Sequence, residues 1–490
     1  MPQLPQAEEP SLRESLLELW REAVPVVASS TLMVACMFTN TLCVSQVGSQ
    51  SEIGGVGLGN MMQNCLVVLW GLGICSAQDT LVAAAHSAGS SELCCHYLQR
   101  CRVICTLQLL WIVPFFWFSD RILAKGGQDA MVAQVAGDYN RITLLGVFGN
   151  FMYQSNLAFL RNKRMPWLGM WIAVVTSALH IAWAVLFIIV QGMGIQGAGW
   201  ANVVTWTIQF LSSSVVILCM KRRLEGSTWE LLFTLKEGFQ QWRSYLEVAV
   251  PSTIQICSCS WFWDICAMVV GLLGPAALAA HVTTMNFVSF LVQPLMALGV
   301  AVSSVVGNCI GARAPMRARR TAWRTVGLAS FLWTSSAVIL VLQREAAAQA
   351  LTKDLETRET VVLLLCIYLV AGCFDMPACI MAAVLRGLAE PKVPAATYLI
   401  CYYLLMLPLG IVFCWPLHLG VAGVWYAMVV GTSVTFTVMF RTLWRVNWTR
   451  CADMAQQRME ADSPKSASTA STADSENISA VAEGENESKL

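Results

Sequence analysis

Two carboxyl groups lie deep inside apolar segments of this 490-residue chain. Asp264 follows Pro251 by about 13 residues and Asp375 follows Val361 by about 14, which places each roughly 20 Å along a membrane-spanning helix. An ionisable residue at that depth costs several kcal/mol to insert and is a functional candidate by default. Removal from water favours the neutral form of a carboxyl. We therefore expect Asp264 and Asp375 to bind and release a cation, most simply H⁺; alternatively, each only hydrogen-bonds a neighbouring helix.

The residues around Asp375 suit cation binding. Its neighbours on the same helix face are small, and they leave room for a lumen or for close helix packing: Ala371, Gly372, Ala378, Cys379 and Ala382. Pro377 removes one backbone hydrogen bond and frees the carbonyl of Cys373, which becomes a further candidate ligand.

Four other side chains in apolar segments each have two interpretations. The rings of Trp261, Tyr402 and Tyr403 can stack on an organic cation, or they pack and anchor their helices. Asp79 lies near one end of its segment, where it is either a gating residue or a structural cap.

Composition places the chain in a membrane. Hydrophobic residues make up 56% and charged residues 12%, too few charges to cover a soluble globule. A net charge of +1 gives no reason to expect a nucleic-acid partner. Cys94, Cys95 and His96 lack a second ligand pair at a defined spacing, so we predict no metal site and no cofactor. We find no nucleophile and base pair, and hence no enzyme.

A window of about 20 residues locates the spans of an all-α membrane protein. Twelve segments qualify: 23–47, 57–84, 100–118, 136–160, 167–190, 199–219, 246–271, 277–304, 325–343, 361–385, 395–415 and 420–442. Residues 1–22 precede them as an N-terminal segment without a signal peptide. Residues 443–490 become rich in Ser, Thr, Ala, Glu and Asp, and we predict a disordered tail.

Lys and Arg gather in the even-numbered connections, which predicts that both termini are cytoplasmic. The sequons at Asn447, Asn477 and Asn486 then lie on the cytoplasmic side and should carry no glycan. We expect the final Ser488-Lys489-Leu490 not to act as a peroxisomal address. The expected location is the plasma membrane or an endomembrane such as the vacuole.

The chain repeats itself at an offset of about 226 residues. Gly194-Ile195-Gln196-Gly197 matches Gly420-Val421-Ala422-Gly423, and Val24-Pro25 matches Val250-Pro251. Two pseudo-symmetric six-helix lobes are predicted, at 23–219 and 246–442, joined by a cytoplasmic loop over 220–245. Lobes of equal orientation favour alternating access, although duplicated bundles can also form channels or receptors.

The chain resembles the eukaryotic branch of the multidrug and toxin extrusion family over most of residues 20–450. The motifs that carry the resemblance stand in family order: Ala77-Gln78-Asp79-Thr80-Leu81 with Asn64 before it, Leu98-Gln99-Arg100, Gly127-Gln128-Asp129, Val306-Gly307-Asn308, Val384-Leu385-Arg386-Gly387, and Tyr402-Tyr403 before Leu407-Pro408-Leu409-Gly410.

The resemblance implies a monomeric antiporter in the lipid bilayer that exports organic cations, xenobiotics or amphipathic metabolites in exchange for H⁺ or Na⁺. Asp264 and Asp375 would bind the coupling ion. The substrate cavity would be lined by Asn64, Cys259, Trp261, Asn286, Tyr402 and Tyr403. A lipid flippase of the same superfamily is the alternative, but it would need a basic lumen.

The sequence departs from the family at several acidic positions. Cys259 stands at the first of two glutamates usual in the seventh span, five residues and about 140° before Asp264. Met285 replaces an eighth-span glutamate of some relatives, and Asn40 replaces an acid of microbial relatives. Because the repeat pairs Asp375 with the neutral Asn150, we expect the ion site in the C-terminal lobe.

Overall fold

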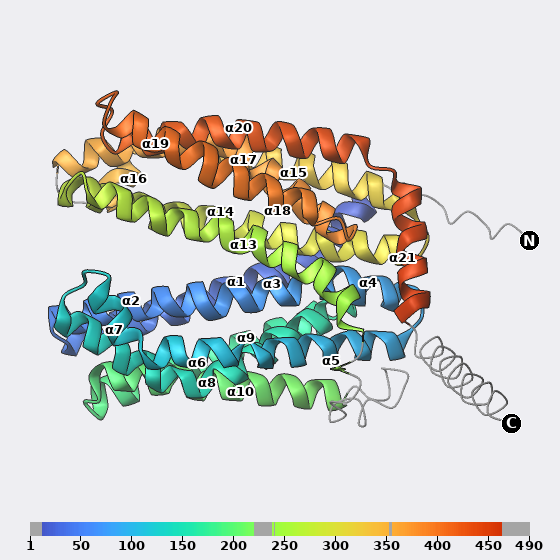
Figure 1. The fold of residues 1–490 in the computed structure, drawn as a ribbon, viewed down its shortest axis with the longest axis horizontal. Coiled ribbons are helices and arrows are strands. Elements are labelled where there is room, and N and C mark those ends of the chain that lie inside the picture. Colours follow the sequence, from blue (N-terminus) through green and yellow to red (C-terminus); the bar gives the residue numbers. More distant parts are fainter. Residues whose placement is uncertain (1–11, 220–237, 240, 352–354, 463–490) are drawn as a thin grey trace, which may run out of the picture.

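The computed structural model describes residues 12–219, 238–239, 241–351 and 355–462. These residues are helical with short connections, and they contain no β-strand. Two bundles lie side by side with their helices roughly parallel (Figure 1). The first bundle, the N-lobe, contains α1 (Leu12–Val47), α2 (Gln50–Gln63), η1 (Asn64–Val68), α3 (Leu69–Ser76), α4 (Gln78–Ser87), α5 (Ser91–Leu107), α6 (Leu109–Trp117), α7 (Ser119–Lys125), α8 (Ala130–Asn162), α9 (Pro166–Ala184), η2 (Val185–Val190) and α10 (Gly194–Cys219).

The second bundle, the C-lobe, is built in the same order. It contains α13 (Trp242–Gly271), α14 (Pro275–Gly311), α15 (Pro315–Leu342), α16 (Arg344–Leu351), α17 (Leu355–Gly387), α18 (Lys392–Leu399), η4 (Ile400–Met406), α19 (Leu407–Cys414) and α20 (Ala422–Arg445). A final helix, α21 (Trp448–Asp462), lies across one end of the molecule. The elements η1, η2 and η4 are π-helical turns inside longer helices.

Helix boundaries repeat at the offset predicted from the sequence. The fifth span of each lobe begins at Pro166 and Lys392, and the sixth ends at Cys219 and Arg445, so both pairs are 226 residues apart. Eleven described helices are long and apolar enough to span a membrane. The twelfth span is α8, whose 33 residues reach about 50 Å. Its mean hydropathy is lowered by buried amides that face the lobe interior, among them Asn140 and Asn156.

Local chemistry explains where several helices start. Ser49 accepts a hydrogen bond from the backbone N–H of Glu52, and the Glu52 carboxylate accepts one from Ser49, which forms a capping box at the start of α2. Asp129 caps α8 by accepting from the backbone N–H groups of Met131 and Val132. Proline occupies the first turn of α9, α14 and α15, where its missing N–H costs nothing.

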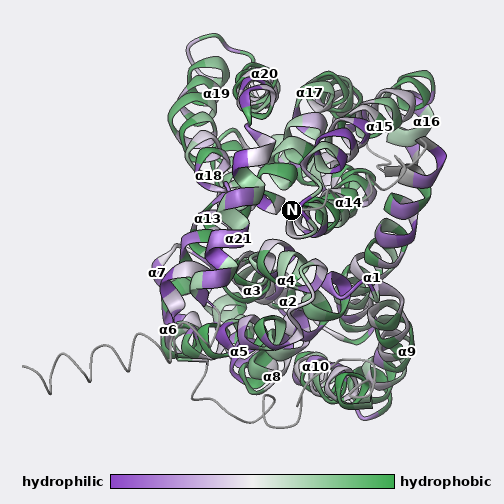
Figure 2. Ribbon diagram, turned by 90° about the vertical axis from the view of Figure 1, so that its right-hand side faces the viewer, coloured by the Kyte–Doolittle hydropathy of each residue, from purple (hydrophilic) through white to green (hydrophobic). Residues whose placement is uncertain are grey.

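The lobes meet at the end that carries α21, which we call the α21 end. A Cβ added to Gly311 would lie 2.2 Å from the carbonyl oxygen of Ala84, so only glycine lets α14 pack this closely on α4. The Thr80 hydroxyl donates to the carbonyl of Arg386, and Ser87 donates to Asn308 at 2.6 Å. Toward the opposite end the ribbons of the two lobes diverge (Figure 1). Figure 2, seen from the α21 end, shows apolar residues covering the long helices of both lobes.

The predicted span at 23–47 is part of a longer helix. This helix begins at Leu12, because the acidic and apolar residues before the span form an amphipathic extension in which Leu19 is buried. The segment 443–490 is not disordered throughout: α20 continues to Arg445, and α21 buries Trp448, Cys451 and Ala452. Enough apolar side chains recur at helical spacing in α21 to dock it.

Some predictions concern residues outside the described ranges. They include the sequons at Asn477 and Asn486, the C-terminal Ser488-Lys489-Leu490, residues 1–11 and most of the predicted loop 220–245. The predicted loop ends earlier than residue 245, since α13 begins at Trp242.

Candidate functional site

Asp375 lies inside the C-lobe, on α17, with only 6% of its surface exposed. The Tyr402 hydroxyl donates to its Oδ1 at 3.3 Å. One helical turn further along α17, Cys379 Sγ lies 3.9 Å from the same oxygen. Tyr402 belongs to η4, where a π-helical turn widens the helix. In the described residues, no ion pair joins Asp375 to a basic side chain, so its carboxyl is held by neutral donors alone.

Cys259 reaches this carboxyl from α13 through Tyr402. Its Sγ lies 3.9 Å from the Tyr402 hydroxyl, and the Tyr402 ring stacks on Tyr398 with centroids 5.2 Å apart. Tyr398 in turn contacts Cys379 Sγ at 3.2 Å. The thiol at the position of the missing family acid therefore borders the Asp375 site. We call Asp375, Tyr402, Tyr398, Cys379 and Cys259 the C-lobe carboxyl site.

Asp264 does not belong to this site. It is partly exposed on α13 and accepts a hydrogen bond from Cys65 of η1 in the N-lobe, at 3.1 Å. Five residues turn a helix by about 140°, so Cys259 and Asp264 face opposite lobes. The two predicted ion-binding acids are thus in different places: Asp375 is enclosed in the C-lobe, whereas Asp264 lies where the lobes face each other.

The predicted cavity residues divide in the same way. Tyr402 lies at the C-lobe carboxyl site, and Tyr403 donates to the carbonyl of Ser258 at 3.1 Å. Trp261 faces Trp70 of the N-lobe with ring centroids 6.3 Å apart, and its indole N–H is buried without a hydrogen-bond acceptor in the described residues. The aromatic residues therefore do not form a single cage.

The two predicted asparagines are more accessible. Asn64 starts η1 next to Cys65 and is partly exposed. Asn286 is exposed on α14, one helical turn before Phe290, which stacks on Phe38 of α1. Trp261 and Asp264 lie on the surface along which the lobes face each other, and Asn64 precedes Cys65, which contacts Asp264 there.

Asp79 was predicted as a gating residue or a structural cap, and Pro377 as a structural residue that frees a backbone carbonyl next to Asp375. Asp79 on α4 forms an ion pair with Arg161 at 2.6 Å and accepts from Asn162 at 2.9 Å, both at the end of α8. The next residue, Thr80, makes the inter-lobe hydrogen bond to Arg386. Pro377 lies inside α17, two residues after Asp375. The Asp79 ion pair thus supports the junction of the lobes at the α21 end.

A buried polar network in the N-lobe was not predicted. His180 contacts Asn40 at 3.1 Å and Thr205 at 2.8 Å, and Asn40 donates to Asn202 at 2.8 Å. Asn202 donates to Tyr139 at 2.9 Å. Of these residues, His180, Thr205 and Asn202 border a cavity of about 50 Å³ that also touches Asn150 and Gln154. The signal in the sequence was a histidine and several amides inside predicted spans.

Taken together, twelve spans in two repeated lobes with buried polar sites define a polytopic helical membrane protein. The MatE family profile matches residues 25–186 and 251–412, starting points that are again 226 residues apart, and the chain belongs to this family. It is therefore a multi-pass integral membrane protein of the multidrug and toxin extrusion class.

Vertebrate relatives match nearly the whole chain. The mouse (Mus musculus) multidrug and toxin extrusion protein 2 is 25% identical, with 93% of this chain and 79% of the relative covered. The rabbit (Oryctolagus cuniculus) protein 2 is 28% identical, with 83% and 67% covered. The crystal structure of the eukaryotic MATE transporter AtDTX14 has the same fold, with a TM-score of 0.82, 21% identity, and 91% of this chain and 98% of that chain covered.

Proposed function

We propose that this transporter exports small organic cations or amphipathic molecules in exchange for H⁺, and that Asp375 carries the exchanged proton. The observation that supports the proposal is the C-lobe carboxyl site. A carboxyl with 6% exposure, a tyrosine donor and no paired cation in the described residues has its charge balanced only when it holds a proton or a cation.

Asp264 is proposed as the second ion-binding acid, and its role differs from that of Asp375. Its hydrogen bond crosses from α13 to Cys65 of the N-lobe, so separation of the lobes would break it. A carboxyl that loses its partner as the lobes separate can attract a cationic substrate. Because Trp261 faces Trp70 of the N-lobe on the same surface, we propose that this surface borders the substrate path and that Asn64, next to Cys65, contributes to it.

The α21 end is proposed to face the cytosol, with both termini on that side. Basic residues near the connections at this end support the orientation, for example Arg164 and Arg317, which both pair with Glu18. One chain contains every residue of the proposed sites, so we expect a monomer to transport. An epitope placed after Leu490 should be detected on cells only after permeabilisation.

Reconstituted vesicles provide the test of the exchange. Full-length protein in liposomes with an acidic lumen and tetraethylammonium outside should accumulate the cation and release protons from the lumen. Asp375→Asn should abolish both fluxes, because a near-isosteric amide cannot exchange a proton. The exposed Glu345→Gln is the matched control and should transport like the parent.

Two further preparations separate the alternatives: vesicles with Na⁺ in the lumen and none outside, at equal pH on both sides, and vesicles with fluorescent phospholipid. Uptake driven by Na⁺ without proton movement would overturn H⁺ coupling. Phospholipid movement without cation uptake would overturn the proposed substrate class in favour of a flippase.

A further inference from the structure

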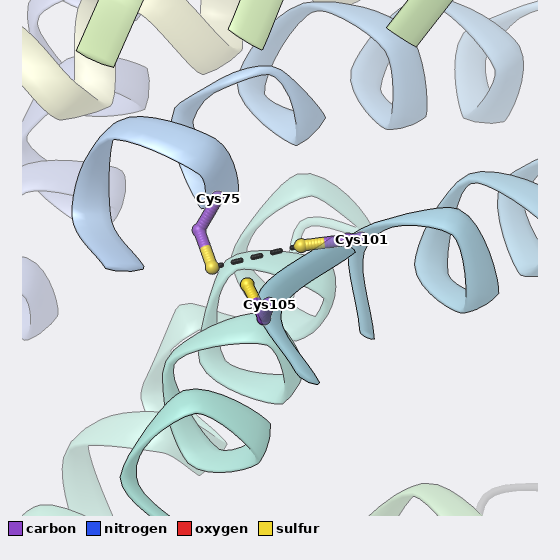
Figure 3. Close-up of side chains that lie close together, drawn as sticks. All are labelled: Cys75, Cys101 and Cys105. Atoms are coloured by element: carbon purple, nitrogen blue, oxygen red, sulfur yellow. Dashed lines mark hydrogen bonds between the residues drawn. The ribbon is translucent and has the colours of Figure 1, made fainter. Parts of the chain in front are cut away.

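Three buried thiols converge inside the N-lobe, away from both sites described above. Cys75 comes from the end of α3, and Cys101 and Cys105 come from successive turns of α5 (Figure 3). Cys75 Sγ and Cys101 Sγ are 3.7 Å apart, and all three sulfur atoms lie within 4.8 Å of one another. Their exposure is 3%, 0% and 0%. All are free thiols.

Helix geometry brings these thiols together. Cys101 and Cys105 are four residues apart, so both project from one face of α5. That face packs on α3, and the Tyr245 hydroxyl of α13 donates to the carbonyl of Ile74, beside Cys75, at 2.9 Å. The three sulfur atoms point toward a common centre in Figure 3. Cys94, Cys95 and His96, the group noted in the sequence, lie earlier on α5 and are not part of this cluster.

The spacing suits three-coordinate metal binding. Metal–thiolate bonds of about 2.3 Å in a trigonal plane place the sulfur atoms about 4 Å apart, close to the distances found here. A structural zinc site needs a fourth ligand. Among the described His, Cys, Asp and Glu side chains, only these three donors converge. Soft thiolate ligands without a fourth donor favour Cu⁺.

A buried cation next to the cluster supports an anionic site. Arg102 follows Cys101 along α5 and is only 7% exposed. Its guanidinium donates to the amide of Asn156, but its Nε has no hydrogen-bond partner and no carboxylate pairs with it in the described part of the chain. A buried charge without a counter-ion is costly. Metal binding releases thiol protons and leaves negative charge on sulfur, which Arg102 offsets.

We propose that Cys75, Cys101 and Cys105 form a Cu⁺ site that links α3 to α5 inside the N-lobe. The site uses no residue of the C-lobe carboxyl site, so it stands independently of the proposed exchange activity. One Cu⁺ replaces the three thiol protons, which leave to solvent. The resulting copper tris-thiolate carries a net charge of −2, of which the Arg102 guanidinium offsets one unit, and no oxidant is required.

Copper retention by the purified full-length protein tests the site. The protein is loaded anaerobically with Cu⁺ in ascorbate and dialysed against bathocuproine disulfonate. We expect one copper per chain to remain. Cys75→Ser, Cys101→Ser and Cys105→Ser should each lower the retained copper at least ten-fold, whereas Cys309→Ser, a buried thiol of the C-lobe, should retain it. Equal retention by the parent and the triple Ser variant would overturn the proposal.

X-ray absorption of the loaded parent protein provides a test that does not depend on the folding of any variant. Three equivalent sulfur neighbours around copper are expected. Two sulfur neighbours, or nitrogen neighbours, would overturn the trigonal site.

Discussion

At the scale of single residues, the Tyr402 hydroxyl is the only hydroxyl among the described residues that donates to Asp375, and we predict a clear effect of its removal. Tyr402→Phe deletes the donor at 3.3 Å while the ring remains stacked on Tyr398. A hydrogen bond to a charged group contributes about 1.5–3 kcal/mol. We therefore expect proton-coupled uptake to fall by about ten-fold or more, measured as initial rate in vesicles.

Tyr403→Phe is the matched control for this prediction. Its hydroxyl donates to the backbone carbonyl of Ser258 and does not contact Asp375. Uptake should stay within about two-fold of the parent, since a partly exposed hydrogen bond contributes little. Equal losses in both variants would mean that the tyrosines act through packing alone.

Cys259 offers a gain-of-function prediction. Because its Sγ lies 3.9 Å from the Tyr402 hydroxyl, a glutamate at this position would bring a second carboxyl to the C-lobe carboxyl site. Two neighbouring carboxyls titrate as a coupled pair. Cys259→Glu should raise uptake of cations or shift the pH dependence of uptake, measured from pH 6 to 8, while Cys259→Ser should leave the pH profile of the parent. Identical profiles for all three proteins would contradict the placement of Cys259.

At the scale of elements, α21 contacts both lobes and connects them. It packs on α14 and α15 of the C-lobe, and at its end Asp462 accepts from Tyr97 of α5 at 2.7 Å and pairs with Arg100 at 3.4 Å. Ser244 at the start of α13 donates to the same carboxylate at 2.8 Å. One carboxylate thus joins the first helix of the C-lobe to the third span of the N-lobe.

Removal of this carboxylate should destabilise the protein. Asp462→Ala leaves Arg100, which is 2% exposed, without its counter-charge, and breaking such a buried pair costs about 3 kcal/mol. We expect a lower melting temperature in detergent and loss of transport at physiological temperature. Truncation after Asn447 should act in the same way, whereas truncation after Asp462 should not.

At the scale of the whole molecule, alternating access requires the lobes to separate at the α21 end. Because Gly311 lies so close to Ala84, a larger side chain at residue 311 does not fit between α14 and α4. In Gly311→Val the new side chain would overlap the backbone of α4, so the lobes cannot close there. We expect the backbone amides of Gln78–Ser87 to exchange hydrogen faster than in the parent. We also expect strongly reduced uptake of cations in vesicles.

Gly327→Val on α15 is the control for this variant. A Cβ at Gly327 meets nothing within 4 Å, so hydrogen exchange in α4 should match the parent. If hydrogen exchange in α4 of Gly311→Val matched that of the parent, the close packing of Gly311 on Ala84 would not hold the lobes together at this end.

Much of the architecture follows from sequence alone. The spans depend on hydropathy over about 20 residues, which is a local property, and the repeat depends on comparison of one half with the other. Both were recovered, and the bounds of α9 and α18 agree with the predicted offset. The depth of Asp264 and Asp375 also follows from counting residues along a helix. The composition of residues 443–490 predicted disorder and missed α21. The 15 amphipathic residues of this helix contribute little to the average composition of a mostly polar tail.

Only the tertiary structure decided which side chains meet. Periodicity assigns Cys259 and Asp264 to different helix faces, but it does not say that one faces Tyr402 and the other Cys65. The meeting of Cys75 with Cys101, like that of His180 with Asn40, joins helices far apart in sequence. Such contacts depend on the rotation and crossing of packed helices, and these are set by the summed packing of many side chains. The sequence therefore determines the spans and their repeat, whereas the neighbours of each buried polar group are determined by how the spans pack.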